Sequence, residues 1–313
     1  MAGVAFVFPG QGAQYVGMGR ELWEAFDYVR DIFEEASDAL GLDLKRLCFE
    51  GPQERLLRTE NTQPAVFVVS VAAARVLQRE LGVEPDLAAG HSLGEYSALC
   101  ISGAMGLREA VWVVRKRGEF MEEACPVGTG AMAAILGLER EKVEELCERA
   151  RGDGEVLVPA NFNCPGQVVI SGHRGAVERA IAVAKEMGAK RALMLNVSGP
   201  FHSPLMEPAA QRLKGVLEGV ALGSPRIPVI SNVDAEPNTS PERAKELLVL
   251  QVKSPVLWED SVRKMVALGV DTFVELGPGK VLSGLIRRTV SDVKVLNLEV
   301  PGDLKRLREA FKV

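Results

Sequence analysis

The chain of 313 residues is poor in cysteine, aromatic residues and histidine, and it has no basic excess. Its 5 cysteines form no CxxC pair, so the sequence indicates neither a disulfide framework nor a thiolate zinc site. A net charge of -5 argues against general affinity for nucleic acid. The first apolar run ends at Pro9, far short of a membrane span, and no basic signal segment precedes it. These absences favour a cytoplasmic protein without nucleic-acid or membrane partners.

Short apolar runs alternate with helical patterns in the two outer parts of the chain, 1–128 and 198–313. Most of these runs are continuously apolar, which is typical of strands that helices cover on both faces. The long connections between them favour parallel pairing. The outer parts are therefore predicted to form one α/β core with a mainly parallel sheet. Its expected strands cover residues 4–8, 87–90, 227–231, 271–276 and 293–298.

The middle of the chain, 129–197, has a different order of elements. From Gly130 to Asn196 the patterns predict strand, helix, strand, strand, helix and strand, with short connections. This β-α-β-β-α-β order is typical of a ferredoxin-like subdomain. We expect a compact insert in the larger core.

A serine motif follows the second expected strand. Residues 90–94, "GHSLG", satisfy G-x-S-x-G and precede a helical segment. A serine at such a sharp turn projects clear of the sheet, and small flanking residues prevent a collision with neighbouring backbone. A helix that begins at Ser92 would direct free N–H groups at a tetrahedral oxyanion, and the N–H of Leu93 is the natural first donor. The alternative is an ordinary strand-to-helix turn in which Ser92 only caps the helix.

A serine nucleophile needs a base, and the chain has 3 histidines. His91 adjoins Ser92, which favours a packing role, and His173 lies in a turn of the expected insert, which favours a surface position. His202 follows the insert where the chain re-enters the core, so it is somewhat better placed to be the base than to be merely structural. No carboxylate has a spacing that marks it as a third triad member, and a backbone carbonyl could orient the imidazole instead. The carboxylates considered are Asp234, Asp271 and Glu275.

One arginine is expected to point inward. The segment 108–124 has a helical pattern, and Arg117 falls on its apolar stripe, whereas Arg115 and Lys116 fall off it. A buried guanidinium is costly without an anion and pairs well with a planar carboxylate. That anion is either a carboxylate of the protein or the free carboxylate of a substrate.

Segments along nearly the whole chain resemble the bacterial malonyl-CoA:acyl-carrier-protein transacylase family, which is shared with acyltransferase domains of fatty-acid and polyketide synthases. The resemblance implies an α/β-hydrolase-like core with a ferredoxin-like insert, in agreement with the element order above. The segments include "FPGQGAQYVGMG" (8–19), "TQPA" (62–65), "GHSLGEYSAL" (90–99), "NFNCPGQVVISG" (161–172), "VSGPFHSPLM" (197–206), "SNVDA" (231–235) and "QVKSPVLW" (251–258).

The resemblance also implies residue roles. Ser92 would be the nucleophile, His202 its base, and the backbone carbonyl of Gln251 the group that orients His202. The backbone N–H groups of Gln11 and Leu93 would form the oxyanion hole. Substrate-binding roles would fall to Arg117, which would clamp the malonyl carboxylate, and to Met121, Phe201 and Asn161.

The expected activity is ping-pong transfer of a malonyl group from malonyl-CoA to the phosphopantetheine thiol of acyl carrier protein, for fatty acid biosynthesis. The acyl group would rest on Ser92 as an ester, and neither a metal nor a redox cofactor is expected. The chain is expected to act as a monomer. Two alternatives stay open from the residues alone: a serine hydrolase, and a non-catalytic module that binds carrier protein.

Overall fold

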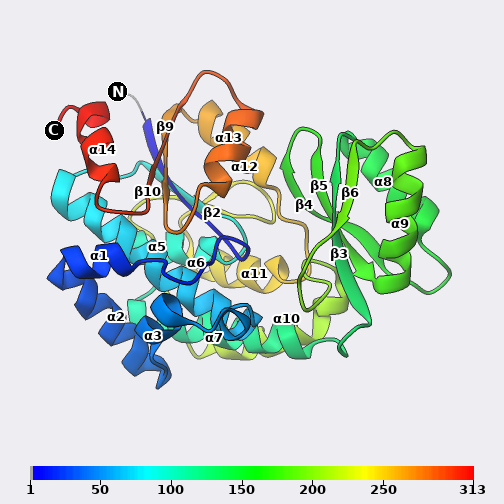
Figure 1. Cartoon of the computed structure of the whole chain (residues 1–313), viewed down its shortest axis with the longest axis horizontal. Coiled ribbons are helices and arrows are strands. Elements are labelled where there is room, and N and C mark those ends of the chain that lie inside the picture. Colours follow the sequence, from blue (N-terminus) through cyan, green and yellow to red (C-terminus); the bar gives the residue numbers. More distant parts are fainter. Residues whose placement is uncertain (1–2) are drawn as a thin grey trace.

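Two β-sheets organise the structure, a computed structural model that describes residues 3–313 (Figure 1). The larger sheet has the strand order β10-β9-β1-β2-β7-β8, and the smaller has the order β4-β5-β3-β6. Figure 1 shows the smaller sheet, with helices α8 and α9, set to one side of the larger one. The strands of the larger sheet are β1 (Gly3–Phe8), β2 (Leu87–Gly90), β7 (Val229–Ile230), β8 (Pro237–Asn238), β9 (Val270–Leu276) and β10 (Lys294–Leu298).

The pairing of the larger sheet is mainly parallel, as the sequence predicts. Strands β10, β9, β1, β2 and β7 pair in parallel, and β8 pairs with β7 antiparallel at the edge. The expected strand at 227–231 is shorter than predicted, because Pro228 has no N–H to donate and regular pairing begins at Val229. Strand β8 was not predicted, since two residues are too few to form a recognisable pattern.

Strand β1 explains why these runs are continuously apolar. Phe6 and Phe8 pack into a core on one face of the sheet, and Ala5 and Val7 pack into a second core on the other face. All four side chains are 0% exposed. Burying a phenylalanine side chain stabilises the fold by roughly 1.5–3 kcal/mol, so both faces hold the sheet in place.

Helices cover both faces of the larger sheet. The first core includes residues of α2, α5, α7 and α10, and the second includes residues of α12 and α13. Of the helices in residues 3–313, none combines the length and apolarity needed to cross a bilayer. The helices outside the smaller sheet are α1 (Arg20–Ala25), α2 (Asp27–Leu40), α3 (Leu44–Glu50), α4 (Gln53–Leu56), α5 (Thr59–Leu81), α6 (Gly94–Ile101), α7 (Leu107–Glu123), η1 (Pro204–Met206), α10 (Glu207–Glu218), α11 (Pro241–Gln251), α12 (Trp258–Ala267), α13 (Val281–Thr289) and α14 (Asp303–Phe311).

The smaller sheet is antiparallel and has its own apolar core, to which α8 and α9 contribute. Its elements follow the predicted order of strand, helix, strand, strand, helix and strand. They are β3 (Gly130–Leu136), α8 (Arg140–Ala150), β4 (Leu157–Cys164), β5 (Gln167–His173), α9 (Arg174–Glu186) and β6 (Arg191–Met194).

Strand β4 joins the two parts of the fold. Phe162 N donates to Val256 O over 2.9 Å, and Val256 N donates to Ala160 O over 2.9 Å. Asn161 therefore lies where the edge of the smaller sheet meets the segment between α11 and α12. Ligands of open α/β sheets bind at the carboxyl ends of the strands, which are here the segments that follow β1 and β2.

Candidate active site

Ser92 lies in the tight turn between β2 and α6. Its φ is 51°, in the left-handed region that a serine adopts only when its surroundings enforce it. Gly90 and Gly94 permit the turn, because a Cβ on Gly90 would lie 1.9 Å from the carbonyl carbon of Gly94 and one on Gly94 would lie 2.1 Å from Phe8 O. Helix α6 begins at Gly94, two residues later than predicted, since a left-handed Ser92 cannot belong to the helix.

His202 meets Ser92 as the sequence suggests. Its Nε2 lies 2.8 Å from Ser92 Oγ, and its Nδ1 lies 2.8 Å from Gln251 O. A carbonyl oxygen only accepts, so Nδ1 carries the proton and Nε2 is free to accept the proton of the hydroxyl. Burial, followed by the charge of Arg117, lowers the pKa of His202 to about 3, and the imidazole is therefore neutral at physiological pH.

The carboxylates considered as a third triad member all have other partners. Asp234 pairs with Arg243, and Asp271 accepts a hydrogen bond from Thr272. Glu275 accepts the backbone N–H groups of Leu282 and Ser283 at the start of α13. The backbone carbonyl of Gln251 therefore orients the imidazole.

Arg117 points inward from α7, as its place on the apolar stripe predicts, and it is only 1% exposed. Its Nη2 donates to Ser92 Oγ and to Gln251 Oε1, each over 2.9 Å, and its Nη1 donates to Gln63 Oε1 over 2.8 Å. Within residues 3–313 the guanidinium has no ion-pair partner. These neutral acceptors bind only Nη1 and Nη2: the buried Nε has no hydrogen-bond partner among the described residues, and the charge has no counter-ion in contact.

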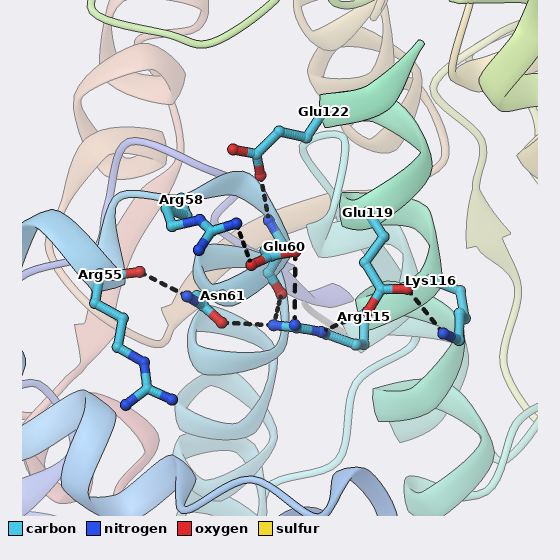
Figure 2. A network of polar contacts seen from close by, with 8 residues as sticks. All are labelled: Arg55, Arg58, Glu60, Asn61, Arg115, Lys116, Glu119 and Glu122. Carbon is cyan, nitrogen blue, oxygen red and sulfur yellow. Dashed lines mark hydrogen bonds and ion pairs between the residues drawn. The ribbon is translucent and has the colours of Figure 1, made fainter.

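The start of α5 is tied to α7, and this contact places Gln63 beside Arg117. Gly118 permits the contact, because a Cβ there would lie 2.7 Å from Glu60 Cα. Figure 2 shows the polar network around it, in which Arg115 binds Glu60, Asn61 and Glu119. The network joins α7 to the start of α5, so Arg115 is satisfied by protein groups while Arg117 enters the site.

Ser92, His202 and Arg117 line one cavity of about 100 Å³, which we call the Ser92 cavity. A larger cavity of about 380 Å³ adjoins it and shares Gln11, His91 and Asn161 with it. Of the residues that the sequence nominates, Gln251 alone lies behind the wall, and it is wholly buried. The others line the Ser92 cavity: Gln11, Ser92, Leu93, Arg117, Met121, Asn161, Phe201 and His202.

The cavity wall also offers free hydrogen-bond donors. Among residues 3–313 the backbone N–H groups of Gln11 and Leu93 have no acceptor. Gln11 comes from the loop after β1, and Leu93 follows Ser92, so both donors line the space next to the hydroxyl. Two such donors are what a tetrahedral oxyanion requires.

The other two histidines bind other partners, although His91 lines the Ser92 cavity. His91 Nε2 lies 2.8 Å from Asn163 Oδ1, and the ring packs 5.9 Å from that of Trp258. His173 ends β5, and its Nδ1 accepts the N–H of Val156.

Three residues of the site were missed by sequence reasoning. Gln63 holds Arg117, Asn232 Oδ1 accepts the N–H of Ser92 over 2.6 Å, and Glu95 accepts from Asn232 and Gln251. Each lies in a segment that carries the family resemblance, but a neutral amide or a helical glutamate has no chemistry that singles it out in a sequence.

A family model described as acyl transferase domain matches residues 5–312 of the sequence. The chain belongs to the acyl transferase family. The family expected from the sequence segments is thereby confirmed, and the elements that carry Ser92, His202 and Arg117 all lie inside the matched range.

Individual members of the acyl transferase family are similar to this chain over its whole length. It is 48% identical over 312 residues to malonyl CoA-acyl carrier protein transacylase of Bacillus subtilis (strain 168), which covers 100% of this chain and 98% of that one. The solved structure of malonyl CoA-acyl carrier protein transacylase from Coxiella burnetii matches with a TM-score of 0.96 at 43% identity, over 98% of this chain and 97% of that one. A malonyl transacylase in complex with its type II polyketide synthase acyl carrier protein matches with a TM-score of 0.96 at 46% identity, over 99% and 100%.

Replacing Gly94 by alanine tests the tight turn. The new Cβ would lie 2.1 Å from Phe8 O, so β1 and α6 must separate, and we expect the free energy of unfolding to fall. The expected loss is roughly 1–3 kcal/mol, measured by chemical denaturation, together with slower labelling of Ser92 by a fluorophosphonate. Gly215→Ala is the control, because a Cβ on that exposed residue of α10 meets no atom within 4 Å. The control should be more stable by roughly 0.5–1 kcal/mol, and equal behaviour of the two variants would contradict the steric explanation.

The pH dependence of Ser92 labelling tests the state of His202. Because its pKa lies at about 3, below the ordinary 6.5, the imidazole stays a neutral base as the pH falls through 6.5. The rate of fluorophosphonate labelling should therefore show no half-loss near pH 6.5 and should decline only at distinctly lower pH. A titration centred on 6.5 would show that burial does not depress the pKa of this group.

Proposed function

We propose that the chain transfers a malonyl group from malonyl-CoA to the phosphopantetheine thiol of acyl carrier protein, for fatty acid biosynthesis. The observation that carries the proposal is the guanidinium of Arg117, which lines the same cavity as Ser92 and His202 and, within residues 3–313, has no anion in contact. The free carboxylate of malonyl is the anion that this cation needs. The names of the similar proteins, malonyl CoA-acyl carrier protein transacylases, support the same substrate and the same partner.

In the first half-reaction Ser92 Oγ attacks the thioester carbonyl of malonyl-CoA while its proton passes to His202 Nε2. The N–H groups of Gln11 and Leu93 stabilise the oxyanion of the tetrahedral intermediate. When the intermediate collapses, the C–S bond breaks and His202 returns the proton to the sulfur of coenzyme A. A malonyl ester remains on Ser92.

In the second half-reaction the thiol of the carrier arm gives its proton to His202, and its sulfur attacks the malonyl ester. The same two N–H groups stabilise the second oxyanion. The intermediate then expels Ser92 Oγ, which recovers the proton from His202, and malonyl leaves on the carrier thiol. These steps invoke no metal and no redox cofactor, and that expectation stays a prediction.

A bound malonyl carboxylate also makes His202 a stronger base. The charge of Arg117 is the second cause, after burial, of the low pKa of His202. A carboxylate on the guanidinium offsets that charge and moves the pKa of His202 toward its ordinary value, where proton transfer from Ser92 is more favourable. An acetyl group has no carboxylate and gives neither the binding nor the improvement.

The remaining walls of the Ser92 cavity suit a short acyl group and an amide-containing arm. Met121 and Phe201 provide apolar surface beside the hydroxyl. Asn161 is 6% exposed, and its carboxamide makes no hydrogen bond within residues 3–313. We propose that it binds the substrate in the adjoining cavity, which it also lines.

We further propose that 1–128 and 198–313 form an α/β-hydrolase-like catalytic core and that 129–197 form a ferredoxin-like subdomain. The antiparallel order β4-β5-β3-β6 and the separate apolar core of the smaller sheet support this division. We also propose that the protein acts as a cytoplasmic monomer. In support, residues of one chain supply every group that the two half-reactions use.

Exchange of Ser92 for alanine tests the acyl-enzyme. Incubation with radiolabelled malonyl-CoA should give a covalent, base-labile label on the wild-type chain and none on Ser92→Ala, because only the hydroxyl forms the ester. Transfer of that label to holo acyl carrier protein should be faster than its loss to water. Label retained by Ser92→Ala would reject the nucleophile, faster loss to water would indicate a hydrolase, and carrier binding without any label would indicate a non-catalytic module.

Arg117→Ala tests the selectivity. A missing partner for a buried charge costs roughly 3–5 kcal/mol, so malonyl transfer should lose roughly 10²–10⁴-fold in kcat/KM. Acetyl transfer has no carboxylate to pair with the guanidinium and should change far less. Steady-state rates with malonyl-CoA and acetyl-CoA measure both effects, and equal losses would show that Arg117 is only structural.

A further inference from the structure

Glu95 is a buried carboxylate that the two half-reactions do not use. It lies in the first turn of α6, three residues after Ser92, and is 4% exposed. It does not line the Ser92 cavity. Its Oε2 accepts two hydrogen bonds, from Asn232 N over 3.0 Å and from Gln251 Nε2 over 2.7 Å.

The first of these partners holds the turn of the nucleophile. Asn232 Oδ1 accepts the N–H of Ser92 over 2.6 Å, and its Nδ2 donates to Gly90 O over 2.7 Å. The carboxamide therefore binds the backbone on both sides of His91, where the chain enters its left-handed conformation. Glu95 in turn holds the backbone N–H of Asn232.

The second partner holds the base and the cation. Gln251 O accepts from His202 Nδ1, and Gln251 Oε1 accepts from Arg117 Nη2. The carboxamide of Gln251 thus lies between a guanidinium, which faces its oxygen, and a carboxylate, which faces its nitrogen. This arrangement admits only one orientation of the amide, since a flip would set like partial charges against both neighbours.

We propose that Glu95 is a positioning residue for acyl transfer: by accepting from Asn232 and Gln251 it keeps Ser92 Oγ and His202 Nε2 within hydrogen-bond distance. The inference rests on the proposed function for the reaction that Glu95 serves. The hydrogen bonds from which it is argued do not depend on that function. Gln251 Nε2 also donates to Ser92 O over 3.0 Å and to Asn232 Oδ1 over 3.3 Å, so Glu95 completes a network that joins these three residues.

The charges around Glu95 do not change this role. Burial raises its pKa to about 7, against the hydrogen bonds from Asn232 and Gln251 and the charge of Arg117, which lower it. Asp234 raises it slightly, and Tyr96 is the neighbouring titratable group on α6. The acceptor role does not depend on the protonation form. A carboxylate accepts at Oε2, and so does a carboxyl group protonated on its other oxygen, so an uncharged glutamine with its amide oxygen in this place should also accept.

Three variants test the role of the acceptor. Glu95→Met keeps the volume but has no acceptor, Glu95→Gln keeps an acceptor without the charge, and Glu95→Ala is the second acceptor-free variant in case the methionine variant does not fold. Glu275→Ala is the matched control, because Glu275 is also a buried glutamate that accepts two N–H groups, but these lie in α13. Circular dichroism and thermal denaturation establish which variants fold.

The acceptor-free variants should lose roughly 10–100-fold in kcat, as when a group that orients a metal ligand is removed, with little change in KM for malonyl-CoA. Fluorophosphonate labelling of Ser92 should slow in parallel, and Glu95→Gln should restore most of both rates. Glu275→Ala should melt at lower temperature yet keep the wild-type labelling rate, so general destabilisation does not produce the effect.

Two results would overturn the inference: wild-type kcat and labelling in a folded acceptor-free variant, or a folded Glu95→Gln that is as slow as the acceptor-free variants. The labelling reaction needs no malonyl group, so it separates this inference from the proposed function. If the wild-type chain reacts with the fluorophosphonate but transfers no malonyl, the proposed function fails while the test of Glu95 stands.

Discussion

A positive charge buried against a reactive hydroxyl is the constraint on which the site depends. Arg117 is almost wholly buried, and its Nη2 lies 2.9 Å from Ser92 Oγ. Taking a guanidinium out of water is costly, and the fold recovers part of that cost through the amide oxygens of Gln63 and Gln251. The part of the desolvation cost that these oxygens do not offset favours the binding of an anion next to Ser92. Burial first, and the same charge second, lower the pKa of His202 and keep its imidazole neutral.

Two left-handed residues face each other across the site. Ser92 has a φ of 51° and His202 a φ of 56°, each an unfavourable conformation for a residue with a Cβ. Such conformations persist only where the surroundings over-determine them. Here Asn232 binds the N–H of Ser92, while His202 N donates to Val252 O over 3.1 Å. The hydrogen bonds that hold these two backbones also keep the two reactive atoms 2.8 Å apart.

The cavity exists because two sheets meet at one edge. The larger sheet presents the loops after β1 and β2, and the smaller sheet closes the opposite side through Asn161 of β4. The paired segment around Val256 fixes that junction, and Gln251 lies just before it at the end of α11. The group that orients His202 and the wall of the cavity are therefore parts of one short stretch of chain.

The sequence by itself determined the features that depend on residues close together in the chain. Apolar periodicity set the order of strands and helices and the inward face of Arg117, and Gly90 and Gly94 marked the turn at Ser92 because only small residues fit there. Tertiary structure alone decided the rest. A backbone carbonyl has no sequence signature, so Gln251 entered as the partner of His202 only through resemblance, and Glu95 was not found at all. Its partners lie more than a hundred residues away, and which of many polar side chains meet in a core depends on how the layers pack.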